Sequence, residues 1–250
     1  VLASTDISVG INRIVFGVID DSFGPLGNSS NVQIAAYLLN DSKARAQTEN
    51  VGAVFRQWPS GVHGVYTSQI NFDRAGEWAL EVSVTAADGL SEMAFKQISV
   101  REESLTPALG SSAPRSESKT VADVVSLKEL TSDGSPDVRL YEMSISEALD
   151  SGRPLVLTFG TPAYCMTATC GPQLEVVKDS MAQNWPKVNY IHVEVYDNLQ
   201  DIHGELSNAR ISPTLIEWGI PSEPWTFVID AEGIIHAKFE GFVTLEELEQ

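Results

Sequence analysis

The two cysteines are the residues of this chain best suited to chemistry, because they lie close together in one segment. Cys165 and Cys170 are separated by four residues, and the 250-residue chain has no other cysteine. An apolar run at 155–159 precedes them, and a helix is predicted to begin near Pro172. A cysteine at a helix start meets unpaired N–H groups and the positive end of the helix dipole, which stabilise a thiolate. The pair therefore predicts thiol–disulfide exchange, an inert disulfide or a soft-metal site.

The spacing of the cysteines restricts the backbone between them. Residues five positions apart lie about 140° apart around an α-helix, so two such cysteines cannot meet on one helical surface. A disulfide also requires closely placed Cβ atoms. If the two sulfurs are bonded, we expect part of the segment 166–169 to be non-helical.

Copper(I) is an alternative ligand, because it prefers thiolate and thioether donors. Met166 lies between the cysteines, and His203 follows a predicted strand, at the sheet edge where ligands gather. These four residues resemble the site of the Sco-type copper chaperones, thioredoxin-fold proteins with a Cys-x-x-x-Cys pair and a distant histidine. The spacing here is one residue longer, and that family's histidine-bearing motif is not matched. The simpler interpretations are a packing role for Met166 and a solvated loop position for His203.

The composition excludes several kinds of partner. The formal net charge is -18, so the chain repels nucleic acid and anionic lipid headgroups. Hydrophobic residues make up 43% of the chain, which is enough for a sizeable core. No apolar run is long enough to span a bilayer. The residues that follow Val1 do not show the charged start and apolar stretch of a signal peptide. We therefore expect that a leader, or a residue carrying a lipid anchor, has been removed, so that any membrane tether lies outside this sequence.

Changes in composition along the chain predict two domains and a linker. Residues 1–101 hold short strand-like runs separated by turn residues, which predicts an antiparallel β-sandwich. In residues 102–120, Ser, Pro and Gly take the place of large apolar residues, and this change in composition predicts a flexible linker. Residues 121–250 mix helical and strand patterns, which predicts a sheet with helices on its faces.

The first domain is predicted to be all-β. Its expected strands lie at 13–19, 32–39, 65–70, 78–84 and 94–100. Tyr66, Phe72 and Trp78 are expected core aromatics. This pattern of turns and aromatics resembles the small immunoglobulin-like domains of bacterial envelope proteins, including the YtkA-like group. The resemblance implies a spacer or docking module that holds the second domain away from a membrane.

The second domain is predicted to alternate helices and strands. Expected helices lie at 144–152, 172–184 and 244–249, and expected strands at 155–159, 190–196, 225–230 and 234–239. The order of these elements, with the cysteines between a strand and a helix and Pro224 just before a strand, resembles the extracytoplasmic thiol–disulfide oxidoreductases of the TlpA kind. The resemblance implies an α/β thioredoxin-like fold, a cis peptide bond at Pro224 and a protein substrate.

The cysteine motif departs from that family, whose members use Cys-x-x-Cys. Cys165 takes the nucleophile position in one alignment, with an enlarged loop to Cys170. In the other, Cys170-Gly-Pro-Gln173 overlays Cys-Gly-Pro-Cys and leaves Gln173 in place of the resolving thiol. The distance from the strand favours Cys165 as nucleophile. The buried acid of many thioredoxins has no counterpart, since Thr158 lies near its place.

A substrate groove is the last feature that the resemblance implies. The family receives an extended partner chain beside the cis-proline, which here gives a shallow apolar groove of Tyr164, Trp218, Pro224 and Trp225. The alternative is that both tryptophans are buried core residues.

Three functions therefore stand as expectations. The first is an extracytoplasmic thioredoxin-like protein of the cell envelope, in which Cys165 attacks a partner disulfide, Cys170 resolves the mixed disulfide and Pro224 shapes the substrate contact. The second is a copper(I)-binding or delivery module. The third is a catalytically inert interaction protein.

Overall fold

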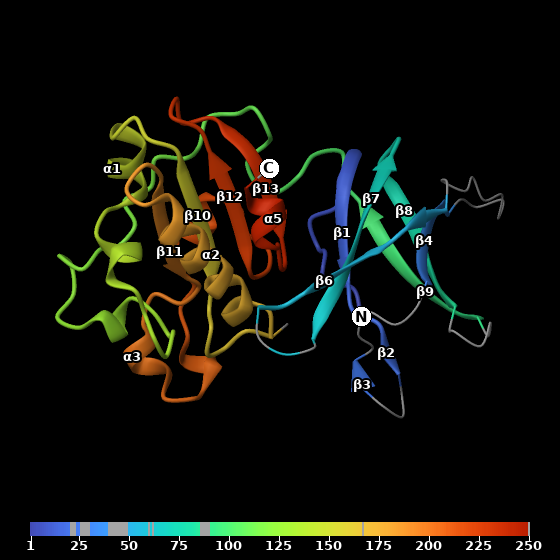
Figure 1. Ribbon diagram of the computed structural model, residues 1–250, viewed down its shortest axis with the longest axis horizontal. Coiled ribbons are helices and arrows are strands. Elements are labelled where there is room, and N and C mark those ends of the chain that lie inside the picture. Colours follow the sequence, from blue (N-terminus) through green and yellow to red (C-terminus); the bar gives the residue numbers. More distant parts are fainter. Residues whose placement is uncertain are drawn as a thin grey trace. The chain divides into compact units, whose positions relative to one another are not determined.

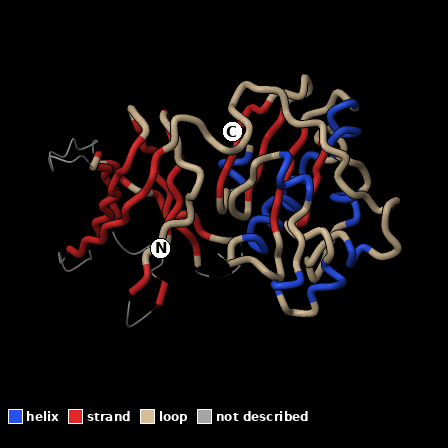
Figure 2. Tube along the Cα trace, turned by 180° about the vertical axis from the view of Figure 1, so that it is seen from behind, coloured by secondary structure: helices blue, strands red, loops and turns tan. Residues whose placement is uncertain are grey.

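A computed structural model divides the chain into two compact units, Val1–Ser104 and Leu105–Gln250. The structure describes residues 1–20, 24–25, 31–39, 50–59, 61, 63–85, 91–166 and 168–249. Every helix in these ranges belongs to the second unit, whereas the first unit holds only strands and loops (Figures 1 and 2). None of the described helices is both long enough and apolar enough to cross a bilayer.

The first unit is a β-sandwich of two antiparallel sheets, as predicted. One sheet has the order β1 (Gly10–Phe16), β7 (Gly64–Phe72), β6 (Val54–Gln57). The other has the order β5 (Val51–Gly52), β4 (Asn31–Leu38), β8 (Gly76–Thr85), β9 (Ser91–Val100). The two-residue strands β2 (Ile19–Asp20) and β3 (Gly24–Pro25) form a small ribbon.

The core of the sandwich is built from alternate residues of both sheets. Tyr66, Phe72 and Trp78 are buried there, as predicted. The rings of Phe72 and Trp78 meet edge to face with centroids 5.2 Å apart, an arrangement that aromatic pairs prefer. The Trp78 Nε1–H donates to the carbonyl of Arg74, so burial leaves no polar atom of this indole unpaired.

The second unit contains a mixed four-stranded sheet. Its order is β11 (Asn189–Glu194), β10 (Leu155–Gly160), β12 (Trp225–Ile229), β13 (Ile235–Glu240). β10 runs parallel to β11 and antiparallel to β12, which forms a hairpin with β13. β10 and β11 are buried along their whole length. Burial on both faces explains the nearly continuous apolar sequence of β10, whereas β11 also carries Asn189, His192 and Glu194.

Two short helices of the second unit begin with a reciprocal cap. In α1 (Ile145–Asp150) the Ser144 hydroxyl accepts from the Glu147 N–H, and the Glu147 carboxylate accepts from the Ser144 N–H. This reciprocal cap satisfies donors that the helix itself cannot pair. Thr244 caps α5 (Leu245–Leu248) in the same way. The longest described helix, α2 (Cys170–Asn184), connects β10 to β11 (Figure 1).

Several short helices have no counterpart in the sequence-based prediction. They are α3 (Leu199–Ile202), α4 (Pro213–Glu217) and the 3₁₀ turns η1 (Leu127–Glu129), η2 (Val138–Tyr141) and η3 (Leu206–Asn208). Segments of this length show no helical period, because they hold at most about one turn.

The prediction of a flexible linker at 102–120 is wrong for residues 105–120, which pack onto the second unit. Backbone hydrogen bonds join residues 110–113 to β13 and to the turn before it. Further along, the Ser116 hydroxyl accepts from the Trp218 Nε1–H over 3.1 Å, and the Ser118 hydroxyl accepts from the Ile145 N–H over 3.1 Å. The segment has few large apolar groups, but its small hydroxyls fit buried donors. We call residues 105–120 the docked segment.

A glycine shows how closely the docked segment approaches. Gly219 has a φ of +61°, and a Cβ atom at this position would lie 2.2 Å from the carbonyl oxygen of Leu105. Only glycine fits there without displacing the backbone.

Candidate functional site

The two cysteine sulfurs are at bonding distance. The Sγ atoms of Cys165 and Cys170 lie 2.36 Å apart, and the Cα atoms 6.0 Å apart. The expectation of a non-helical segment between them is confirmed, because α2 begins only at Cys170. Ala168 adopts a left-handed φ of 57°, and its N–H approaches the Cys165 carbonyl at 3.5 Å. This turn brings the two cysteines together.

The start of α2 provides a donor for the first sulfur. The backbone N–H of Cys170 donates to the Sγ atom of Cys165 over 3.3 Å. An N–H in the first turn of a helix has no partner within the helix and lies at the positive end of its dipole. Electron density on Cys165 Sγ is therefore stabilised, whether as a disulfide sulfur or as a thiolate.

The two sulfurs differ in their access to solvent. Cys165 is half-buried in the loop, whereas Cys170 is only 2% exposed. A molecule approaching from outside meets Cys165 first. This asymmetry agrees with the alignment that makes Cys165 the nucleophile. Gln173, which the other alignment puts in place of a resolving thiol, is fully buried and accepts a hydrogen bond from the Val243 N–H.

Pro224 lies near Cys170, at the end of β10. The Glu223–Pro224 peptide bond is cis. A Cβ atom at Gly160, the last residue of β10, would lie 3.6 Å from the Cβ of Cys170 and 3.8 Å from the Cβ of Pro224. The end of β10, the start of α2 and the residue before β12 therefore meet at one place.

Glu223 adds a carboxylate to the rim of this site. Its Oε1 atom accepts a hydrogen bond from the Met166 N–H, over 3.4 Å, in the loop between the cysteines. Burial raises the pKa of Glu223 above its ordinary value, and the hydrogen bond from Met166 opposes that rise. Sequence reasoning used Glu223 only as the residue before Pro224.

A buried histidine lies on the same side of the sheet. His192 Nδ1 is 2.8 Å from the Tyr141 hydroxyl, and its Nε2 is 3.2 Å from the Gly160 carbonyl. Burial lowers the pKa of His192 to about 4, so the ring is neutral near pH 7. With Nε2 donating to Gly160, Nδ1 accepts from Tyr141.

Glu194 is the functional candidate that the sequence analysis missed. It pairs in register with Gly160, so its side chain points to the face of the sheet that carries Cys170. Burial raises the pKa of Glu194 to about 7, while donors from neighbouring residues oppose the rise. The available signal was an acidic residue that alternates with Tyr190 and His192 along a predicted strand.

Glu194 is connected to the cysteine loop through one serine. The Glu194 Oε2 atom accepts from the Ser132 N–H over 2.8 Å and from the Ser132 hydroxyl over 2.9 Å. The Ser132 oxygen in turn accepts from the Ala163 N–H, over 3.1 Å, two residues before Cys165. A cavity of about 260 Å³ borders Glu194 and His192. The buried carboxylate therefore helps to fix the position of the loop.

The proposed apolar groove is only partly present. Trp218 and Trp225 are buried in the core, with exposures of 0% and 3%, so they do not line a substrate surface. Their indole N–H groups donate to Ser116 and Ser222 respectively. This corrects the groove expectation in favour of its alternative. Tyr164 is half-buried and packs edge to face against Tyr196, with centroids 6.0 Å apart.

The copper(I) alternative finds no assembled site. Among the residues that the structure describes, no group of three or more His, Cys, Asp or Glu side chains could hold a metal ion. His203 is exposed at the C-terminal end of α3, and Met166 is 84% exposed.

Comparisons with protein-family models, with curated proteins and with solved structures found no match.

Proposed function

We propose that the second unit is a thioredoxin-like domain that exchanges thiols and disulfides with partner proteins through Cys165 and Cys170. The observation that carries the proposal is the pair's placement: a half-buried Cys165 bonded to a buried Cys170 at the first residue of α2. The helix N–H aimed at the outer sulfur stabilises a thiolate more than a disulfide sulfur, because the thiolate carries a full negative charge.

The arrangement of elements supports the same assignment. A β10–α2–β11 unit is followed by the β12–β13 hairpin and α5, and the cysteines lie at the β10–α2 junction. Pro224 stands directly before β12 and beside the disulfide. This is the order that the resemblance to TlpA-like proteins implies, with a longer loop between the cysteines.

The exchange reaction proceeds in two steps. In the reduced protein, the Cys165 thiolate attacks one sulfur of a partner disulfide, and the partner's other sulfur leaves as a thiolate that takes up a proton. Cys170 then loses its proton and attacks Cys165 Sγ, which releases the partner's second thiol. The partner gains two electrons and two protons, and the Cys165–Cys170 disulfide forms. We assign Glu194, a buried carboxylate on the same face of the sheet, as the group that accepts the proton of Cys170.

The direction of exchange in the cell depends on the reduction potentials of the pair and of its partner. Disulfides persist in oxidising compartments, which supports a location outside the cytoplasm, in the cell envelope. We further propose that the first unit is an immunoglobulin-like spacer or docking module, since its described residues form a sandwich around an aromatic core.

Trapping of the mixed disulfide tests the proposed function. Insulin serves as the disulfide substrate, and the reduced full-length chain is compared with Cys165→Ser, Cys170→Ser and the double variant. We expect Cys170→Ser to accumulate a mixed disulfide through Cys165, and Cys165→Ser to lose insulin reduction. Full activity of Cys165→Ser, or a wild-type disulfide that resists strong reductant and exchanges with nothing, would overturn the proposal.

A further inference from the structure

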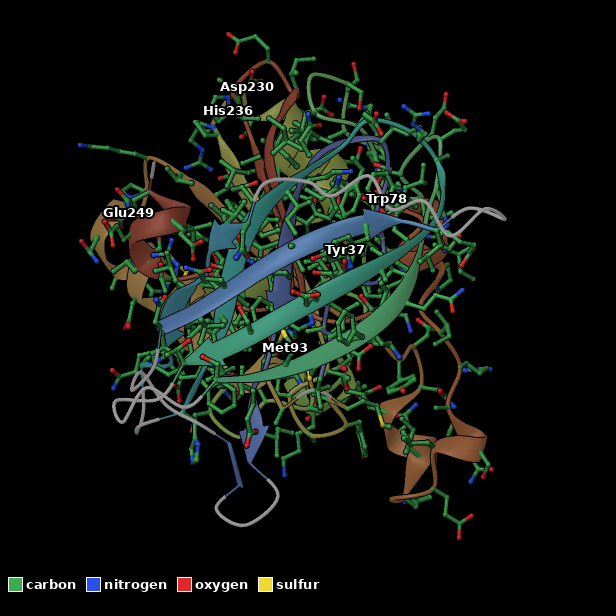
Figure 3. The ribbon with its side chains drawn as sticks, turned by 90° about the vertical axis from the view of Figure 1, so that its right-hand side faces the viewer. Tyr37, Trp78, Met93, Asp230, His236 and Glu249 are labelled. Carbon is green, nitrogen blue, oxygen red and sulfur yellow. A yellow bond between two sulfur atoms is a disulfide. The ribbon has the colours of Figure 1, made fainter. Side chains whose placement is uncertain are left out.

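Strand β9 forms an edge of the first unit's larger sheet, with its outer side unpaired by any described strand. It pairs with β8 on one side only, from Gly76↔Val100 to Thr85↔Ser91 (Figure 3). Residues 91–97 are all exposed, including Met93 at 64% and Phe95 at 57%. An edge strand with open backbone donors and acceptors is a template for pairing with another chain.

The side chains of β9 fall on two faces. Glu92, Ala94 and Lys96 pair with Val84, Val82 and Leu80 of β8, so they share the face that carries the buried Leu80. Met93 and Phe95 lie on the opposite face. A cavity of about 300 Å³ on the Leu80 face is lined by this part of β9 together with Leu2 and Phe16.

The sequence of the exposed half of β9 is self-complementary. It reads Glu92-Met93-Ala94-Phe95-Lys96. If two copies pair antiparallel around Ala94, Glu92 meets Lys96 of the second copy, and Met93 meets Phe95 of the second copy. Opposite charges and sulfur–aromatic contacts are both favourable cross-strand pairs.

The ion pairs seen among the described residues include neither Glu92 nor Lys96. Four positions along a strand separate them by about 13 Å, which is too far for an ion pair. A charge on an edge strand normally discourages pairing, because it would meet an apolar or like-charged neighbour. In the register centred on Ala94, each charge meets its opposite.

We propose that β9 pairs antiparallel with β9 of a second copy of this chain, in the register centred on Ala94. The partner is a second copy because the charge order of the strand is complementary to itself. Strand pairing buries less surface than a permanent dimer interface, so the dimer forms reversibly and depends on protein concentration.

Sedimentation velocity of the full-length chain over a range of concentrations tests this proposal. We expect a shift from monomer to dimer as concentration rises. Lys96→Glu and Glu92→Lys each put like charges opposite one another, and each should weaken dimerisation by about tenfold or more. Both residues are exposed, so the variants should fold, which far-UV circular dichroism checks. Lys128→Glu, an exposed charge reversal in the second unit, should leave dimerisation unchanged.

Charge exchange makes the test specific to the register. In an equal mixture of the Lys96→Glu and Glu92→Lys variants, a dimer of one with the other has opposite charges at both pairs of positions. We therefore expect the mixture to associate, whereas either variant alone does not. The combined Glu92→Lys/Lys96→Glu chain should dimerise like the wild type. A wild type that stays monomeric at all concentrations would refute the proposal, and so would single variants that dimerise normally or a mixture that fails to associate.

Discussion

The backbone N–H of Cys170 donates a hydrogen bond to the Sγ atom of Cys165, over 3.3 Å, at the first residue of α2. The donor belongs to the buried cysteine and the acceptor to the accessible one. One short turn therefore gives the two sulfurs different environments, and this difference assigns them different roles in the proposed exchange.

The first prediction concerns the reactivity of the two thiols. In the reduced protein near pH 7, we expect iodoacetamide to alkylate Cys165 at least about tenfold faster than Cys170, because Cys165 is accessible and its thiolate is stabilised. Mass spectrometry of the alkylated peptides measures both rates. In strong denaturant the two rates should become similar. Faster alkylation of Cys170 in the folded protein would contradict the assigned roles.

The second prediction concerns Glu194 and the pH dependence of stability. Burial raises the pKa of Glu194 from 4.5 to about 7. Between these two pH values, Glu194 is protonated in the folded state and ionised in the unfolded state. Stability due to this group therefore falls as pH rises from about 4.5 to about 7. Glu194→Gln should remove that loss, which amounts to about 3 kcal/mol at most. Urea unfolding of both proteins across this range measures the difference, and the exposed Glu217→Gln serves as control.

The third prediction concerns His192, which acts with the opposite sign. Burial lowers the pKa of His192 from 6.5 to about 4, so the unfolded state binds a proton that the folded state does not. The contribution of this group to stability rises with pH between about 4 and about 6.5. In His192→Gln this rise should be absent, whereas His236→Gln, at an exposed position, should keep it. If the free energy of unfolding changed with pH in the same way in wild type and His192→Gln, that result would contradict a buried neutral ring.

The fourth prediction tests the docked segment. Ser116→Ala removes the acceptor of the buried Trp218 Nε1–H, and we expect the free energy of unfolding of the second unit to fall by about 1–3 kcal/mol. Ser112→Ala lies in the same segment at an exposed position and should change it by less than about 0.5 kcal/mol. Equal effects of the two substitutions on chemical denaturation would indicate that residues 105–120 do not depend on this hydrogen bond.

The sequence by itself determined the elements whose patterns are regular or strongly signalled. Alternating apolar residues predicted β7 and β8, a continuous apolar run predicted β10, and the patterns at 144–152 and 244–249 predicted α1 and α5. The cysteine pair and Pro224 could be singled out because few residue types perform their chemistry. These signals are local, so neighbouring residues are enough to reveal them.

Only the tertiary structure decided how distant residues meet. Residues 105–120 look like a linker in the sequence, because nothing nearby shows what their hydroxyls bind. The hydroxyls accept hydrogen bonds from Trp218 and Ile145, which lie far along the chain. Trp218 and Trp225 could be surface or core until their neighbours were placed. Glu194 gains its raised pKa from burial and its link to the cysteine loop from Ser132, which lies 62 residues earlier. Burial and long-range hydrogen bonding depend on the whole fold, and no short stretch of sequence encodes them.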